Sequence, residues 1–171
     1  MGLLKDLSKL FSSESEYGTP SQTLQGETVK SRAEQRIADY FTKNGIRYVY
    51  ERAAKTDGLI IKRTFAHPDF YLPDFKVYVE YWGLVGASRD YRRTMKWKMA
   101  QYHEAHIKFI SLYPENLDNL DWVFRAKFKT VVGVELPAKH KAGADQDRFC
   151  TGCGTPAVVD GKFCTKCGRA L

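Results

Sequence analysis

Apolar positions recur with two different periods along the chain, which predicts a core built from both helices and strands. The first segment with helical spacing opens with the capping pattern of Ser31 and Glu34 and closes at Asn44-Gly45. The predicted helices are residues 31–44, 88–105 and 114–130. Alternating or β-branched apolar residues, typical of strands, occupy residues 46–51, 59–65 and 107–112. This order predicts an α/β fold, a mixed sheet flanked by helices, over residues 29–132.

Between the second predicted strand and the second helix, residues 67–82 have the pattern of a β-hairpin. Residues 69–72 and 76–82 form its arms, and a Pro-Asp turn near Asp74 joins them. Apolar residues flank Glu80 on both faces, which indicates a central strand covered on both sides. A turn centred near Asp74 places Asp69 opposite Glu80, with their Cβ atoms about 5 Å apart.

The two acidic side chains of this hairpin lie in apolar surroundings. An ionised carboxylate is costly to bury unless a cation or a hydrogen-bond donor satisfies it. Two facing carboxylates form an oxygen-lined site that suits Mg²⁺, the ion used to hydrolyse phosphodiesters. For Glu80 alone, a basic side chain is an equally good partner. Pro-Asp-Phe occurs twice, and we prefer Asp69 to Asp74 because Asp74 lies at the turn.

The helix predicted over residues 88–105 carries a lysine on its apolar face. With Tyr91 at the centre, Met95, Lys98 and Tyr102 fall on one side, together with Met99 and His106. A lysine in such a stripe needs a carboxylate, a phosphate or a water molecule. The alternative is that its stem is buried while the ammonium reaches solvent.

Outside residues 29–132, two stretches are rich in small and polar residues. Residues 12–28 and 133–148 are therefore predicted to be linkers. Before the first linker, residues 3–11 place their leucines and Phe11 on one helical face. Such a short helix either frays or caps the core, or it docks on a partner or a membrane surface. Residues 1–28 thus form an amphipathic helix and a flexible linker in this interpretation.

The four cysteines form two CxxCG pairs near the C-terminus. They are Cys150, Cys153, Cys164 and Cys167. Four thiolates at this spacing are typical of a structural Zn²⁺ site, and they predict a small zinc ribbon over residues 149–171. A redox dithiol is the alternative. DNA binding, protein docking and stabilisation of the chain end are all open as the role of this module.

Composition narrows the class of partner. The chain has 171 residues with a net charge of +7 and a pI of about 9.2, which favours a polyanion such as DNA or RNA. A merely soluble basic protein would have the same balance. No apolar run is long enough for a membrane span, and no secretory segment is recognisable, so we expect a cytoplasmic protein.

Several short motifs occur in an order that resembles a known family. They are Lys30-Ser31-Arg32-Ala33-Glu34, Asn44-Gly45-Ile46-Arg47-Tyr48-Val49-Tyr50-Glu51, Pro68-Asp69-Phe70-Tyr71-Leu72-Pro73 and Tyr78-Val79-Glu80-Tyr81-Trp82-Gly83. With a lysine in the next helix, they resemble the PD-(D/E)XK nuclease superfamily, and particularly the nuclease-like domains attached to some DNA helicases. The resemblance covers residues 31–116, about half of the chain, and implies a restriction-endonuclease-like fold.

The resemblance implies a role for each matched residue. Asp69 and Glu80 would bind Mg²⁺ or Mn²⁺, the backbone carbonyl of Tyr81 would complete the site, and Glu34 would be an auxiliary ligand. The superfamily usually has a lysine two residues after the glutamate, where this chain has Trp82. In the helicase-attached relatives the lysine lies in the following helix, and Lys98 matches that arrangement.

The expected function is therefore a metal-dependent DNA endonuclease in repair, recombination or defence, with a helicase or another repair protein as partner. Basic residues at the start of the second helix, Arg89, Arg92 and Arg93, would contact the DNA phosphates. Members of this superfamily often act as homodimers. The alternatives are a catalytically inactive DNA-binding or adaptor protein with the nuclease fold, and an RNA-binding zinc protein with an incidental acidic hairpin.

Overall fold

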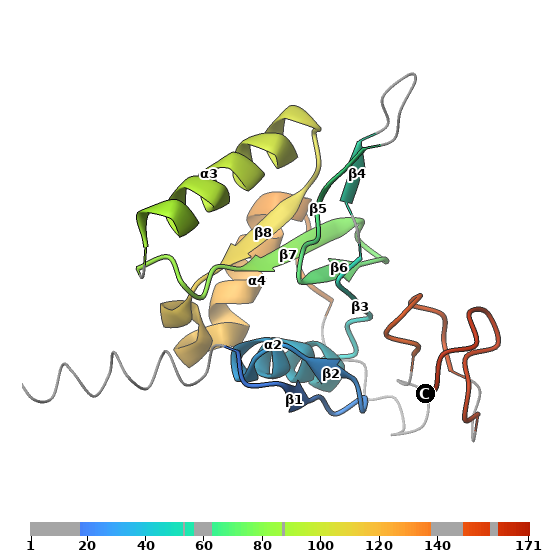
Figure 1. The fold of residues 1–171 in the computed structure, drawn as a ribbon. Helices are drawn as coiled ribbons and strands as arrows, with labels where there is room; N and C mark the ends of the chain where they lie inside the picture. Colours follow the sequence, from blue (N-terminus) through green and yellow to red (C-terminus); the bar gives the residue numbers. More distant parts are fainter. Residues whose placement is uncertain (1–17, 53, 57–62, 87, 138–148, 158–160) are drawn as a thin grey trace, which may run out of the picture.

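A mixed sheet of four strands forms the centre of the protein (Figure 1). The computed structural model describes residues 18–52, 54–56, 63–86, 88–137, 149–157 and 161–171. Across the sheet the strands are β3 (Val49–Tyr50), β6 (Phe70–Leu72), β7 (Val77–Tyr81) and β8 (Phe109–Leu112). β7 pairs antiparallel with β6 and parallel with β8. The predicted mixed α/β fold and the central position of β7 are confirmed.

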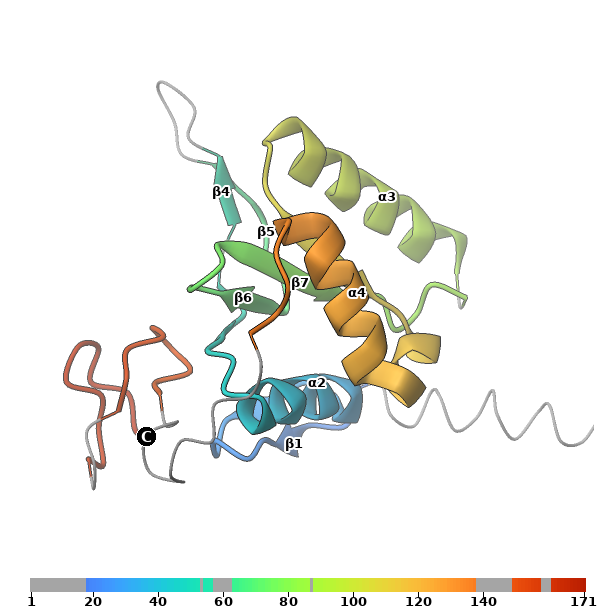
Figure 2. The same cartoon turned by 180° about the vertical axis from the view of Figure 1, so that it is seen from behind.

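Three α-helices cover the two faces of the sheet. They are α2 (Arg32–Lys43), α3 (Arg89–Glu104) and α4 (Leu120–Val132), and the 3-10 helix η1 (Pro114–Asn119) leads into α4. Figure 2 shows α4 crossing the face of the sheet that is turned away from α3. Apolar side chains of α2 and α4 join those of the sheet in one core. The predicted bounds of these helices agree with the structure to within a few residues.

Phe41 is the centre of the aromatic packing in this core. It is fully buried, and its ring centroid lies 5.8 Å from that of Tyr48, 5.5 Å from Phe70 and 5.2 Å from Phe124. Edge-to-face pairs at such distances add to the burial of apolar area. Helix α2 is thereby fixed against β6 and α4, which in turn fixes the position of its first turn.

Serine caps start α2 and α3. The Ser31 hydroxyl accepts a hydrogen bond from the Glu34 N–H at 3.2 Å, and the Ser88 hydroxyl accepts from the Tyr91 N–H at 3.0 Å. The reciprocal half of the predicted capping box differs. The Glu34 carboxylate accepts from the N–H of Lys30, at 2.9 Å, rather than from that of Ser31.

The predicted linker of residues 12–28 is wrong for residues 18–28. Here β1 (Ser21–Gln22) pairs antiparallel with β2 (Thr28–Val29). Its turn closes through the Thr23 hydroxyl, which accepts from the Glu27 N–H at 3.2 Å. Strands of two residues are too short to show an alternating pattern, so the polar composition suggested a linker. The rest of the predicted segment, including the amphipathic stretch 3–11, lies outside the described residues.

A second hairpin was predicted only in part. β4 (Ala54–Thr56) pairs with β5 (Arg63–Ala66) in a sheet of its own. The predicted strand 59–65 overlaps β5, whereas residues 59–62 lie outside the described part of the chain. Of the predicted linker 133–148, residues 138–148 also lie outside it, but Leu136 is buried in the core. None of the described helices combines the length and apolar character needed to cross a membrane.

Candidate functional site

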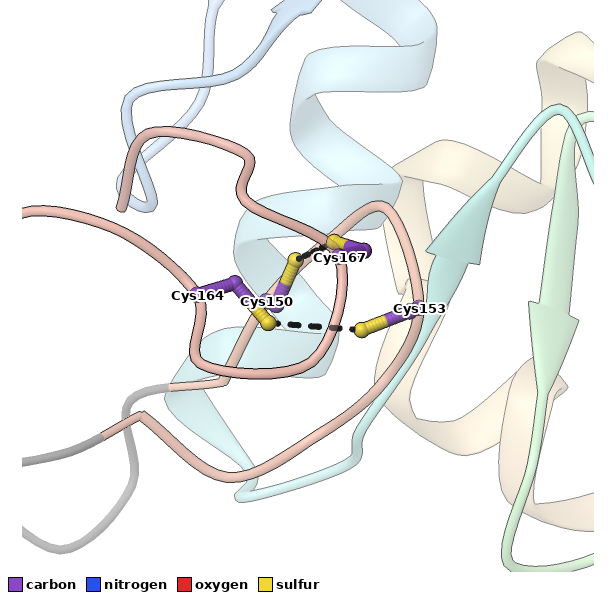
Figure 3. Close-up of side chains that lie close together, drawn as sticks. All are labelled: Cys150, Cys153, Cys164 and Cys167. Carbon is purple, nitrogen blue, oxygen red and sulfur yellow. Dashed lines mark hydrogen bonds between the residues drawn. The ribbon is translucent and has the colours of Figure 1, made fainter.

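The four cysteines lie together in the C-terminal module. Figure 3 shows their sulfur atoms turned toward one another from two separate turns of the chain. The Sγ atoms of Cys150 and Cys167 are 3.5 Å apart, as are those of Cys153 and Cys164, and all four lie within 4.8 Å of one another. Zinc–sulfur bonds of about 2.3 Å in a tetrahedron require sulfur atoms about 3.8 Å apart. The cluster therefore fits a Zn²⁺ ion.

The surroundings of the thiols also favour metal binding. Hydrogen bonding to the Thr155 hydroxyl lowers the pKa of Cys153 to about 6, and the backbone N–H of Cys167 lowers the pKa of Cys164. Burial raises the pKa of Cys150 to about 12. Because zinc binds thiolates, a bound ion would have to displace the proton from Cys150 while Cys153 already favours the charged form.

The register of the central hairpin agrees with the prediction from sequence. Phe70 lies opposite Val79 and Leu72 opposite Val77, so the same register continued by one residue brings Asp69 opposite Glu80. Asp69 Oδ2 accepts a hydrogen bond of 2.7 Å from the Tyr81 N–H. The two acids therefore lie side by side on the face of the sheet that α3 covers.

Glu80 receives two partners from α3. Its Oε1 atom lies 2.7 Å from Lys98 Nζ and accepts a hydrogen bond of 2.6 Å from the Tyr102 hydroxyl. The Glu80 side chain is 3% exposed and that of Lys98 is 20% exposed, so this ion pair is shielded from solvent. Glu80 Oε2 makes no hydrogen bond to a described residue, nor does Asp69 Oδ1. Among the contacts of the described residues, one oxygen of each acid is thus without a hydrogen bond.

Trp82 occupies the position at which the resembled family carries its lysine, and it contacts the lysine of α3. Lys98 Nζ lies 5.2 Å from the centroid of the Trp82 ring, within the range of a cation–π interaction. The ring is buried, and its Nε1 donates to the Ser111 hydroxyl of β8 at 2.9 Å. Ser111 lies opposite Glu80 in the parallel pair of β7 and β8. The Lys98 ammonium is therefore held by both Trp82 and Glu80.

Glu34 approaches the same region from the first turn of α2. Its Oε2 atom accepts a hydrogen bond of 2.6 Å from the Tyr50 hydroxyl as well as the bond from Lys30 N–H. The residue is buried, and its charge acts on Asp69. Among the described residues, however, the four cysteines are the one group of three or more potential ligands whose ligand atoms all lie within 4.8 Å. The three acids form a looser cluster than that.

Burial sets the protonation behaviour of the hairpin acids. It raises the pKa of Asp69 well above the ordinary value, and the charges of Glu80 and Glu34 raise it further. Burial also raises the pKa of Glu80, although the charge of Lys98 counteracts this. Acids with raised pKa values that lie together are typical of metal and catalytic sites, because a cation relieves both the burial and the mutual repulsion.

The remaining predicted site residues are Tyr81 and three arginines of α3. Tyr81 is fixed by its N–H to Asp69 and by its pairing with Leu112. The three arginines Arg89, Arg92 and Arg93 lie exposed in the first turns of α3, where they form an exposed basic surface. Arg93 makes an exposed ion pair with Asp90 at 3.7 Å, and Arg92 donates to the carbonyl of Val85 at 3.4 Å.

The sequence alone did not identify every residue that contacts the acids. Tyr102 was placed on the apolar face of the predicted helix 88–105 without a role toward the acids, and Tyr50 was named only within a strand and a family motif. Both hydroxyls bind a carboxylate, at 2.6 Å in each case. Comparison of the chain with models of known families, with curated proteins and with solved structures found no match. Any functional conclusion therefore depends on the geometry described above.

Proposed function

We propose that the chain is a metal-dependent nuclease of the PD-(D/E)XK type that hydrolyses phosphodiester bonds in DNA, with a zinc ribbon as its C-terminal module. One observation carries the proposal. Asp69 and Glu80 lie opposite one another at the end of a hairpin, and a lysine from the neighbouring helix contacts Glu80 at 2.7 Å. This hydrolysis requires two acidic side chains and an ammonium group close together, and these three residues supply them.

The oxygens Asp69 Oδ1 and Glu80 Oε2 would hold Mg²⁺ or Mn²⁺. When bound, the ion neutralises charge on the scissile phosphate and lowers the pKa of a water molecule for attack on phosphorus. Glu34 would be an auxiliary ligand of the ion or of a water molecule, and hydrogen bonds from Tyr50 and Lys30 hold its carboxylate in position. Each of these residues is held in position by hydrogen bonds or an ion pair within the protein.

Lys98 would stabilise the charge that gathers on the phosphoryl oxygens in the transition state. The Trp82 ring and the Glu80 carboxylate hold its ammonium group between α3 and β7 before any substrate binds. Such preorganisation matters because a flexible lysine would have to be ordered during the reaction. The arginines Arg89, Arg92 and Arg93, exposed on the same helix, would contact the phosphates that flank the cleaved bond.

A cleavage assay with supercoiled plasmid and with labelled single-stranded, duplex and branched oligonucleotides tests the proposal. The wild-type protein, supplied with Mg²⁺ or Mn²⁺, is compared with Asp69→Asn, Glu80→Gln and Lys98→Met. We expect each substitution to reduce the cleavage rate at least 100-fold, as the loss of one charged catalytic group commonly does. Lys43→Met, on the exposed side of α2, is the control and should cleave like the wild type. Undiminished cleavage by the three variants would refute the proposed site.

One observation favours a second candidate, a nuclease-fold protein that binds DNA without cleaving it. Glu80 Oε1 is already paired with both Lys98 and Tyr102, so the burial of this carboxylate does not require a metal ion as its partner. Titration calorimetry with Mn²⁺ separates the two candidates. An active site predicts binding that Asp69→Asn abolishes, whereas an adaptor predicts no binding of Mn²⁺ together with binding of DNA.

A further inference from the structure

The first cysteine turn, residues 149–155, lies against the segments that carry the acidic cluster; we call it the first knuckle. The Tyr50 N–H donates to the carbonyl of Thr151 at 3.2 Å, so the knuckle adds to the outer edge of β3. The Phe149 ring meets that of Tyr48 edge to face, with centroids 5.3 Å apart. In the figures, the module lies beside β3 in both views (Figures 1 and 2). The module is thus packed onto the domain and is not a separate tail.

Gly154 lets the knuckle approach both β3 and the turn of the acidic hairpin. A Cβ atom at this position would lie 3.2 Å from the Pro73 side chain and 3.4 Å from that of Val49. The residue also has a φ angle of +72°, which favours glycine. Because Pro73 belongs to the turn between β6 and β7, the knuckle contacts the hairpin that bears Asp69 and Glu80.

Arg47 joins the same three segments through one guanidinium group. Its Nη1 donates to the carbonyl of Gly154 at 3.0 Å, while Nε donates to Asp74 Oδ2 at 2.9 Å and Nη2 pairs with Asp74 Oδ1. Bidentate pairs of this kind are strong and directional. Arg47 comes just before β3, Asp74 lies in the turn of the acidic hairpin, and Gly154 closes the knuckle.

The other side of the same segment contacts the acids. The Tyr50 hydroxyl donates to Glu34, and the Glu51 N–H donates to the carbonyl of Asp69 at 2.9 Å. Residues 47–51 therefore have the first knuckle on one side and two of the three acids on the other. A displacement of the knuckle would be transmitted to the acids within a few residues.

We infer that Arg47 and the first knuckle position the acidic cluster, so that zinc binding by the four cysteines and divalent-cation binding by Asp69 and Glu80 are coupled. The coupling to divalent-cation binding by Asp69 and Glu80 rests on the proposed function. Arg47 is a positioning residue, since it touches neither the acids nor the metal sites directly. Coupling between two sites is reciprocal and typically amounts to about 5- to 150-fold in affinity. The module would thus support the site through residues 47–51 and would not act as an independent binding unit.

The experiment compares Arg47→Met and Arg47→Lys with the control Lys43→Met, all as the full chain loaded with zinc. In hydrogen exchange, Arg47→Met should expose the Tyr50 and Glu51 amides, and their exchange should accelerate about tenfold or more. The same variant should release zinc to a chelator about tenfold faster. Arg47→Lys, which keeps one hydrogen bond to the knuckle or to Asp74, should recover part of both effects. Lys43→Met should change neither.

A Mn²⁺ titration completes the test, at a temperature at which every variant is folded. Arg47→Met should weaken Mn²⁺ binding about tenfold, an effect that a merely less stable protein would not show well below its melting temperature. Unchanged amide exchange and zinc release in Arg47→Met would overturn the inference. If the wild type binds no Mn²⁺, the proposed function fails, and amide exchange and zinc release alone decide whether Arg47 positions the knuckle.

Discussion

Replacing Asp69 by Asn tests whether repulsion between the Asp69 and Glu80 carboxylates lowers the free energy of unfolding of the protein. Two carboxylates about 5 Å apart repel one another by about 3 kcal/mol at an effective dielectric constant of about 20. The Lys98 ammonium offsets part of this, which leaves a cost of about 1–2 kcal/mol at neutral pH without a divalent cation. Asn has nearly the same shape as Asp, and its side-chain oxygen can still accept the hydrogen bond that Asp69 accepts from Tyr81.

The dependence on pH follows from the raised pKa values of Asp69 and Glu80. A raised pKa means that the folded state binds a proton more readily than the unfolded state. The resulting stability is fully present below the unfolded pKa values, near 4, and is lost as the pH rises through the folded values. Asp69→Asn should therefore gain little at pH 4, and its gain should grow toward about 1–2 kcal/mol as the pH rises through the folded pKa of Asp69.

Thermal unfolding of the zinc-loaded protein without added Mg²⁺ measures this effect. For a chain of this length a gain of 1 kcal/mol raises Tm by about 2–4 °C. Adding Mg²⁺ should raise the Tm of the wild type but not that of Asp69→Asn, because only the wild type binds the ion. Asp118→Asn, on the exposed side of η1, serves as the control. A variant that is less stable than the wild type at pH 8, or that Mg²⁺ stabilises equally, would refute the reasoning.

Three further substitutions test the fold around the site. Phe41→Ala should lower the free energy of unfolding by about 3–5 kcal/mol in urea denaturation, because its ring packs against those of Tyr48, Phe70 and Phe124 in the core. A loss below about 1 kcal/mol would contradict the described packing. Ser31→Ala should cost about 1 kcal/mol in the same measurement, since the Glu34 N–H loses its acceptor; Ser31→Asn, which can still cap the helix, should cost less. Cys164→Ser should abolish tight zinc binding, measured by metal content after dialysis, and zinc retained at the wild-type level would exclude the four-cysteine site.

Local patterns were sufficient to predict the elements that carry the site. The Pro-Asp turn and the apolar residues around Glu80 determined the register of the hairpin, because a shift by one residue would expose the apolar face. Helical spacing placed Lys98 on the inner face of α3, where it contacts Glu80. Serine caps gave the starts of α2 and α3. In each case the residues that predict the element lie within it or directly beside it.

The features that sequence reasoning missed depend on contacts between distant segments. The two-residue strands β1 and β2 show no period of their own, and they pack on α2 through Asp39, which accepts from the Leu24 N–H at 2.7 Å. The partner of Glu34 is a tyrosine 16 residues further along the chain. Arg47 and Gly154 are 107 residues apart, and no local pattern predicts that they meet. The packing of the cysteine module against β3 therefore became visible only in three dimensions.

The bond between Arg47 and Gly154 has a consequence for biosynthesis. A ribosome adds about 5–20 residues per second, so the residues around Arg47 emerge about 5–20 s before the turn that completes their surroundings. During that time β3 has an open edge and the loop after it lacks one of its supports. In a nascent chain the segment that follows Arg47 would thus stay without these contacts until residues 149–155 have been synthesised and have packed against β3.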